Sequence, residues 1–220
     1  MNAGPAVLVM ARAPWPGTVK TRLTPMLGAG GCARLQASLI RRTAALAETA
    51  APGACYVAFD PPDAGNMLAD LVPAGVALLA QRGADLGQRM AAAADDVFEL
   101  RAGPLVVVGT DVPTLTAADL RAAFDALAAG LDLVLGPARD GGYYLVGLSR
   151  PLPGLFAIDP TLWGGDRVLA ATVAAAADAG LDSALLDLRG DLDTPADAWA
   201  LLADPLLPGD IAALLTAGPA

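Results

Sequence analysis

The sequence predicts an α/β protein: a three-layer α/β/α sandwich built on a Rossmann-like, mostly parallel sheet with one antiparallel strand. Short apolar runs of strand length alternate along the chain with longer segments of helical apolar spacing, which is typical of helices packed on both faces of a parallel sheet. One pair of strand-like runs is joined by too few residues for a parallel crossover, so one strand should be antiparallel. With 220 residues, 55% of them hydrophobic, the chain can bury a large core. We expect residues 1–220 to form a single domain.

In the first half of the chain, predicted strands alternate with predicted helices. Apolar side chains at Leu35, Leu39, Ile40 and Leu46 have helical spacing, and the fully apolar run at 105–108 is typical of a buried strand. The predicted strands are 6–10, 54–59, 76–80 and 105–108, and the predicted helices are 31–49 and 86–101.

The second half contains the predicted antiparallel strand. The strands 133–136 and 143–148 are separated by only a short turn, so they cannot be joined by a parallel crossover. The other predicted elements are helices at 117–129, 167–179 and 195–202, the last with Thr194 as its N-cap, and a strand at 184–188. The apolar segments 206–208 and 211–215 are expected either to dock on the core or to join two subunits of a homodimer.

Composition excludes several classes of function. The chain has 14 Lys and Arg against 23 Asp and Glu, a net charge of −9, which argues against a nucleic-acid partner. Charges interrupt every long apolar stretch before about 18 residues, so no membrane span is expected. The N-terminus has no basic region before its short apolar run, and a cytoplasmic protein is expected. Cys32 and Cys55 are expected to be small core residues.

The chain contains no histidine, and this restricts its chemistry. Ser-His-Asp and Cys-His nucleophile systems, imidazole general bases and His-based zinc sites are all excluded. A metal ion would have to bind oxygen ligands, and carboxylates favour Mg²⁺ or Mn²⁺, most naturally together with nucleotide phosphates.

A basic loop follows the first predicted strand. It reads MARAPWPGTVKTRL and brings Arg12, Lys20 and Arg22 into one short segment, while Gly17 and the prolines shape a backbone with few side chains in the way. Because ligands of open α/β sheets bind at the carboxyl ends of the strands, this loop predicts a site for a phosphate-rich ligand. The same composition also fits a solvated turn.

Two acidic segments follow other strands. Asp111, preceded by Thr110, comes directly after the strand 105–108 and is predicted to hold a divalent ion, although an Asp before a Pro can also cap a turn. Asp191 and Asp193 follow the last predicted strand. Because they alternate along an extended segment, we expect them to point to opposite sides, with one facing the cleft as a second metal ligand and the other structural.

Two further segments are candidates for ligand contacts. Between the strands 133–136 and 143–148, Asp140 and Tyr143 offer an acceptor and a hydroxyl, and Gly141 and Gly142 permit close approach of a ligand; a tight hairpin would need the same glycines. The segment 81–89 opens a helix, and Gln81 with the backbone amides near Leu86 and Gly87 is predicted to contact a nucleobase, although a simple capped helix start looks alike. Trp163 is either a lid over the acceptor or a packed side chain beside a Gly turn.

Together these motifs resemble a known family. RAPWPGTVKTRL, QRGADLGQRM, VVVGTDVPTL, GPARDGGYYLVGL, LWGGDRVL and DLDTPAD resemble, in this order, the motifs of small bacterial glycosyltransferase-A-fold transferases. These proteins are often encoded near radical-SAM proteins and are associated with arsenosugar-type clusters. The family is similar to 2-phospholactate guanylyltransferase and, more distantly, to the molybdenum-cofactor guanylyltransferase, and the resemblance covers roughly residues 6–200.

The resemblance implies a nucleotide-diphospho-sugar transferase fold and roles for particular residues. Lys20 and Arg22 would bind the nucleotide phosphates, Asp111 would bind metal, and Asp191 or Asp193 would complete the metal site. The GPARDGGYY segment would face the acceptor. Sugar transferases of this fold typically have an Asp-x-Asp pair after the central strand, whereas this chain has a single Asp111 followed by Val112 and Pro113, which is nearer the nucleotidyltransferase pattern.

The sequence therefore predicts metal-dependent nucleotidyl transfer. A small phosphate or phosphonate acceptor would attack the α-phosphorus of a nucleoside triphosphate, and pyrophosphate would leave. An acceptor that is already an anion needs no general base. Glycosyl transfer from an NDP-sugar to a hydroxyl acceptor is the alternative, with Asp140 as the base, and a catalytically silent nucleotide-binding module is a second alternative.

Overall fold

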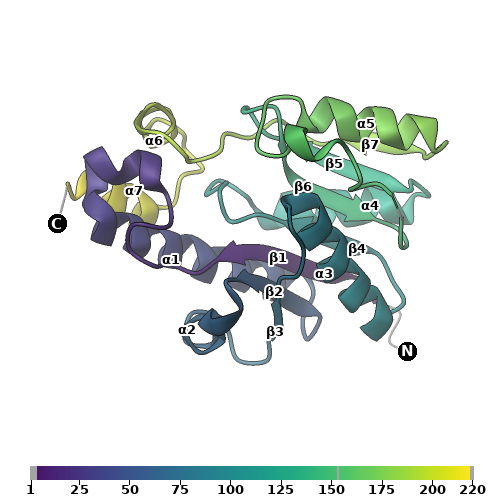
Figure 1. The fold of residues 1–220 in the computed structure, drawn as a ribbon, viewed down its shortest axis with the longest axis horizontal. Helices are drawn as coiled ribbons and strands as arrows, with labels where there is room; N and C mark the ends of the chain where they lie inside the picture. Colours follow the sequence, from purple (N-terminus) through teal and green to yellow (C-terminus); the bar gives the residue numbers. More distant parts are fainter. Residues whose placement is uncertain (1–3, 153, 219–220) are drawn as a thin grey trace.

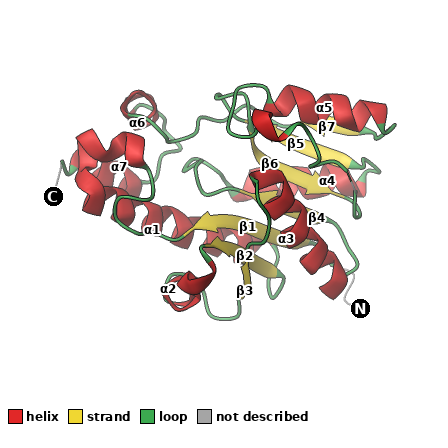
Figure 2. Ribbon diagram, viewed as in Figure 1, coloured by secondary structure: helices red, strands yellow, loops and turns green. Residues whose placement is uncertain are grey.

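The computed structural model describes residues 4–152 and 154–218 and contains one seven-stranded sheet (Figures 1 and 2). In sequence order the strands are β1 (Ala6–Arg12), β2 (Cys55–Asp60), β3 (Ala77–Ala80), β4 (Leu105–Val108), β5 (Leu133–Pro137), β6 (Tyr143–Leu148) and β7 (Ser183–Leu185). They lie in the order β3-β2-β1-β4-β6-β5-β7. Only β6 is antiparallel to its neighbours, β4 and β5, which confirms the predicted mixed sheet.

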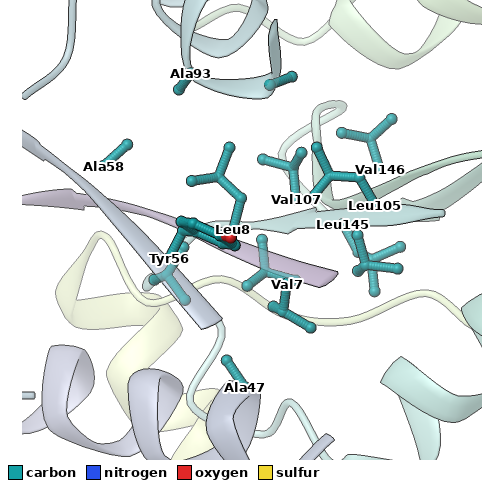
Figure 3. Close-up of a cluster of buried hydrophobic side chains, with 14 of the residues drawn as sticks. Val7, Leu8, Ala47, Tyr56, Ala58, Ala93, Leu105, Val107, Leu145 and Val146 are labelled. Carbon is teal, nitrogen blue, oxygen red and sulfur yellow. The ribbon is translucent and has the colours of Figure 1, made fainter. Parts of the chain in front are cut away.

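Helices cover both faces of this sheet, which confirms the predicted three-layer architecture. The helices are α1 (Thr24–Ala50), α2 (Gly65–Ala69), α3 (Leu86–Leu100), α4 (Ala117–Ala128), α5 (Val168–Asp178), α6 (Pro195–Leu202) and α7 (Gly209–Thr216). Adjacent residues of β1 point to opposite faces, so Val7 lies on the side of Ala47 in α1 and Leu8 on the side of Ala93 in α3 (Figure 3). Both β1 residues are fully buried.

The boundaries of two elements differ from the prediction by three or more residues. Helix α1 begins at Thr24 instead of residue 31, with Pro25 in its first turn, and Gly28 interrupts it with a φ of 68°. Because Gly28 breaks the helical backbone, the apolar residues before it are out of phase with the helical spacing after it, and the periodicity does not reveal the first turn of α1. Strand β7 ends at Leu185 instead of residue 188. The Leu186 amide still donates to the Leu135 carbonyl of β5 at 2.8 Å, but the next pairing is an isolated bridge between Arg189 and Ala138.

A second, smaller apolar cluster lies apart from the main core. Helix α1 contributes Leu27 and Leu35 to it, α7 contributes Ile211 and Leu215, and Leu192 is fully buried in it. Helix α7 therefore docks on α1 of its own chain, which is the first of the two arrangements expected for the C-terminal segment (Figure 1). In the described part of the chain, no helix has the length and apolar character that crossing a membrane requires.

The two cysteines are free and buried, as expected. Burial, assisted by the nearby charge of Glu48, raises the pKa of the Cys55 thiol to about 12. This thiol is therefore protonated and inert at neutral pH.

Candidate functional site

A cleft of about 520 Å³ opens at the carboxyl ends of β1 and β4, where the sequence places the ligand site. Among the predicted site residues, those that line it are Arg12, Lys20, Arg22, Gln81, Leu86, Thr110, Asp111, Asp140, Gly142, Tyr143, Asp191 and Asp193. Strand β6 begins at this edge because it runs antiparallel to β4, so the β5–β6 turn also reaches the cleft. Gly17, Gly87 and Gly141 are not among the lining residues.

Lys20 lies at the centre of the charged part of the cleft. Its Nζ donates to Asp111 Oδ1 at 2.5 Å, to Asp193 Oδ1 at 2.9 Å and to the Leu192 carbonyl at 2.8 Å. The Lys20 side chain is only 4% exposed, whereas those of Asp111 and Asp193 are 53% and 40% exposed. Burial by itself would lower the pKa of Lys20, but the two carboxylates outweigh it and raise that pKa. Lys20 is therefore a buried cation shared by two carboxylates.

The backbone at Lys20 is strained. Lys20 has φ 49° and ψ 37°, the left-handed region, and is the only non-glycine residue with positive φ in the described chain. Its carbonyl accepts from the Leu23 amide at 2.8 Å and from the Cys32 thiol at 3.2 Å, contacts that hold this conformation. Such strain costs about 1–3 kcal/mol and is concentrated at functional sites.

Asp191 and Asp193 both line the cleft, so the expectation that they point to opposite sides was wrong. Side chains two residues apart on extended backbone share a side, and it is the intervening Leu192 that points away, into the second apolar cluster. The Leu192 amide donates to the Asp111 carbonyl at 2.8 Å, which joins the two acidic segments. Burial, and then the charges of Asp140, Asp197 and Asp193, raise the pKa of Asp191.

Asp111 is held by a short polar chain that starts in α1. The buried Gln36 amide donates to Thr110 Oγ1 at 3.2 Å and to the Arg12 carbonyl at 3.3 Å. Thr110 Oγ1 in turn donates to Asp111 Oδ1 at 3.5 Å. The alternative that Asp111 caps a turn does not hold among the described residues, because its carboxylate accepts from the Lys20 and Thr110 side chains and from no backbone amide. The helix that follows is capped by Thr116, in a capping box with Asp119. Gln36 was missed from the sequence, since a single Gln inside a helical pattern gives no signal.

A second ion-pair group lies on the β2 side of the cleft. Asp60 Oδ2 is 3.1 Å from Arg89 Nη1 and 3.6 Å from Arg12 Nε. Asp60 and Arg89 both line the cleft and were not predicted. The position of Asp60 at the carboxyl end of a strand is the signal that could have identified it.

Gln81 contacts the sheet as well as the cleft. Its amide nitrogen donates to the carbonyls of Ala58 at 2.8 Å and Ala11 at 3.2 Å. Both N–H groups of this amide are therefore used, and its Oε1 is the atom left to contact a ligand. Gln81 can accept a hydrogen bond from a nucleobase but cannot donate one in this arrangement.

Two glycines predicted to face a ligand pack within the protein instead, and a third shapes the basic loop. A Cβ at Gly87 would lie 2.6 Å from the indole of Trp163, and one at Gly141 would lie 2.1 Å from the carbonyl oxygen of Asp166, so both glycines allow close packing within the protein. Gly17 has φ 81° and open space beside it, so it shapes the loop backbone. Trp163 itself packs on Gly87 and also lines the cleft.

Tyr143 does not offer its hydroxyl as predicted. The ring lines the cleft, but the hydroxyl oxygen is buried and has no hydrogen-bond partner in the described structure. Burial raises the pKa of this phenol. In the same turn, the Asp140 carboxylate accepts from the Gly142 amide at 2.9 Å and remains exposed.

A partly buried ion pair fixes the acidic segment to α4. Arg189 Nη2 is 2.6 Å from Asp119 Oδ1, and their side chains are 17% and 8% exposed. The Arg189 amide donates to the Pro137 carbonyl at 3.0 Å. The chain that carries Asp191 and Asp193 is thus attached to both β5 and α4 immediately before those residues.

The three predicted metal ligands do not form a set of three. In residues 4–152 and 154–218, no group of three or more His, Cys, Asp or Glu side chains is arranged to hold a metal ion. Asp111 and Asp193 are nevertheless brought together, since one oxygen of each lies within hydrogen-bond distance of the same ammonium group.

The fold is shared with solved structures of nucleotide-using enzymes. A protein of Desulfovibrio desulfuricans G20, provisionally named a nucleotide-diphospho-sugar transferase, is 29% identical with a TM-score of 0.82, over 97% of this chain and 94% of that chain. A cytidylyltransferase from Leptospira borgpetersenii is 14% identical with a TM-score of 0.59, over 98% and 94% of the two chains. A CMP:2-keto-3-deoxy-manno-octonic acid synthetase complexed with CTP is 13% identical with a TM-score of 0.57, over 90% and 97%.

These similarities confirm the expected fold, and the relatives belong to the expected class of transferases. No curated protein matches the sequence significantly. One family model matches residues 43–163, more than half of the chain, and this match includes the strand that precedes Asp111 and the β5–β6 turn. The chain belongs to the DUF2064 family, described as an uncharacterized protein conserved in bacteria.

Proposed function

We propose that this protein is a nucleotide-utilising transferase that binds a nucleoside triphosphate in the cleft and transfers its nucleotidyl group with release of pyrophosphate. The observation that carries the proposal is the convergence of Asp111, Asp193 and Lys20 beside the basic loop, at the carboxyl edge of the sheet. Proteins with the same fold include a synthetase complexed with CTP and a cytidylyltransferase, which supports the same class of donor.

The donor set suits a divalent cation. Two carboxylate oxygens converge on one position, which is already occupied by a positive charge, the Lys20 ammonium, and hard oxygen ligands are those that Mg²⁺ and Mn²⁺ prefer. We assign Asp111 and Asp193 as its ligands. When bound there, such a cation would supply charge neutralisation and polarisation of a phosphoryl oxygen.

The remaining residues of the cleft form two groups: arginines that would contact the phosphates, and uncharged groups that would contact the base. Arg22 lies in the basic loop with no carboxylate within 4 Å among the described residues, so it is available to neutralise the leaving pyrophosphate. Arg12 is 60% exposed and held only loosely by Asp60, and it would assist. Gln81 Oε1 and the backbone at the start of α3 would contact the base.

For nucleotidyl transfer we propose a small phosphate or phosphonate acceptor. Its attacking oxygen already carries negative charge, which suits a chain that has no histidine to act as a base. The single Asp111 followed by Val112 and Pro113 favours this reaction over sugar transfer.

One observation favours the second candidate, glycosyl transfer from an NDP-sugar. Asp140 and Asp191 line the cleft, and in the described chain neither has a cation within 4 Å. An anionic acceptor would be repelled by these carboxylates, whereas a hydroxyl acceptor could donate a hydrogen bond to Asp140 and lose its proton to it.

Thermal unfolding with each nucleoside triphosphate and common NDP-sugars, with and without Mg²⁺, tests the donor. Ligand at about 100 times its Kd adds roughly 2.7 kcal/mol, and a Tm increase of about 5–10 °C is expected for a chain of this size. A Mg²⁺-dependent increase with one triphosphate supports nucleotidyl transfer, and an increase with an NDP-sugar only supports the second candidate.

The reaction product then separates turnover from simple binding. With the stabilising donor and a panel of acceptors, pyrophosphate indicates nucleotidyl transfer and nucleoside diphosphate indicates glycosyl transfer. Stabilisation without either product across the panel would identify a nucleotide-binding module without activity.

A further inference from the structure

Lys20 has no free donor in this structure. An ammonium group has three N–H donors, and here Asp111 Oδ1, Asp193 Oδ1 and the Leu192 carbonyl accept all three. The side chain is only 4% exposed, so the ammonium group has little contact with solvent. In this arrangement Lys20 cannot bind a phosphate.

The Lys20 ammonium also uses the carboxylate oxygens that a divalent cation would need. Oδ1 of Asp111 and Oδ1 of Asp193 both contact Nζ, at 2.5 Å and 2.9 Å. A second cation placed between the same two oxygens would lie against the ammonium, and like charges so close repel strongly. The ammonium and the metal ion are therefore alternatives at this position.

We propose that Lys20 is the resident cation of the Asp111–Asp193 pair and competes with the divalent cation for it. This inference rests on the proposed function, because it concerns the same carboxylates. In the nucleotide-free protein Lys20 occupies the pair and keeps metal affinity low. Triphosphate gives the ammonium a new anionic partner, so Lys20 leaves the carboxylates as the metal–nucleotide complex binds.

The chain offers a direct probe of this exchange, because Lys20 is its only lysine. Amine-directed acetylation followed by mass spectrometry of proteolytic fragments therefore reports on Lys20, and the α-amino group is distinguished by its own fragment. Other cations of the chain are arginines, which do not react.

The first experiment measures Mn²⁺ binding to the nucleotide-free protein by calorimetry and by electron paramagnetic resonance. The Lys20→Met variant is expected to bind Mn²⁺ at least tenfold more tightly than wild type. Arg22→Met removes a positive charge from the same loop without touching either carboxylate and should change the affinity by less than about twofold, as expected for an exposed charge. The double variant Lys20→Met/Asp111→Asn should lose the tighter Mn²⁺ binding expected of Lys20→Met.

The second experiment needs no variant and so does not depend on the folding of Lys20→Met. In wild type, Lys20 should be acetylated slowly without metal and at least tenfold faster in saturating Mn²⁺ without nucleotide, because it is then displaced with no phosphate to receive it. Unchanged Mn²⁺ affinity in Lys20→Met, no Mn²⁺ binding by that variant, or continued protection of Lys20 at saturating Mn²⁺ would each overturn the proposal. All these readouts use the nucleotide-free protein, so they are distinct from a failure to find turnover.

Discussion

At the scale of single residues, the candidate site is held together by contacts between residues that lie far apart in the sequence. Lys20 contacts Asp111, 91 residues away, and Asp193, 173 residues away. Asp111 is also held by Thr110, which Gln36 orients from α1. In the ligand-free structure, Asp111 and Asp193 are therefore held in position by contacts from distant parts of the chain, which reduces the cost of organising the site.

Under the proposed function, Asp111→Asn removes a charged ligand of the divalent cation, so it is expected to lower the turnover of the cognate donor and acceptor at least about 100-fold. The overall fold should persist, since the Asp111 side chain is half exposed. Steady-state kinetics and circular dichroism measure the two effects. Asp125→Asn, an exposed change on α4, should leave the rate unchanged, and near-normal turnover in Asp111→Asn would contradict the role of this residue.

Gly87→Ala is expected to destabilise the protein by about 2 kcal/mol, the usual cost of overpacking. The new Cβ would lie 2.5 Å from the Phe156 carbonyl and 2.6 Å from the Trp163 indole. Urea unfolding gives the free energy, and Trp fluorescence should change as the indole shifts. Gly209→Ala, which meets nothing within 4 Å in the first turn of α7, is the control and should be neutral or slightly stabilising. Equal stability of both variants would show that the indole moves freely.

At the scale of elements, the segment after β7 depends on tertiary contacts, not on secondary structure. It forms one isolated bridge just beyond β5, between Ala138 and Arg189, and then an ion pair to α4 through Asp119. Leu192 then anchors it in the second apolar cluster. An irregular segment held at three points can place Asp191 and Asp193 on the same side of the cleft.

Arg189→Met is expected to destabilise the protein by about 2 kcal/mol, because it leaves the Asp119 carboxylate buried without its cation. Chemical denaturation measures this. Arg150→Met is the matched control: it removes the arginine of a more exposed pair with Asp132, whose side chains are 57% and 25% exposed, and should cost less than about 1 kcal/mol. A smaller loss for Arg189→Met than for the control would show that the pair does not anchor the segment.

At the scale of the whole molecule, the C-terminal helices complete the structure around α1. The second apolar cluster joins the start of α1 to α6 and α7, which lie together on the C-terminal side of the molecule (Figure 1). Lys20 precedes α1 and Asp193 precedes α6, and their contact closes this side of the cleft.

Ile211→Ala is expected to lower the free energy of unfolding by about 2–4 kcal/mol, because Ile211 is fully buried between α7 and α1. Thermal and urea unfolding measure the loss. Leu206→Ala truncates a side chain that is 44% exposed and should cost less than about 1 kcal/mol. If both changes cost the same, α7 would not be docked as described.

Most of the fold could be predicted from the sequence, and so could many of the residues that line the candidate cleft. Periodicity identifies the strands, and the short 136–143 connection identifies β6 as antiparallel. Helix α2 and the early start of α1 were not predicted, since five residues carry little periodic signal and Gly28 interrupts the pattern. The sequence did not identify three further residues in or beside the cleft, because their roles depend on partners in other elements: Gln36, Asp60 and Arg89.

The sequence by itself determined the alternating α/β architecture and the edge of the sheet at which the basic loop and the acidic segments meet. It could do so because apolar periodicity is local and the carboxyl ends of parallel strands share one edge. That Asp191 and Asp193 share a side follows from the two-residue period of extended backbone, so it could have been predicted. Only the tertiary structure decided that Gly87 receives an indole and that Lys20 holds two carboxylates. These outcomes depend on how distant elements pack, and packing fixes the direction of a side chain only when all of its neighbours are in place.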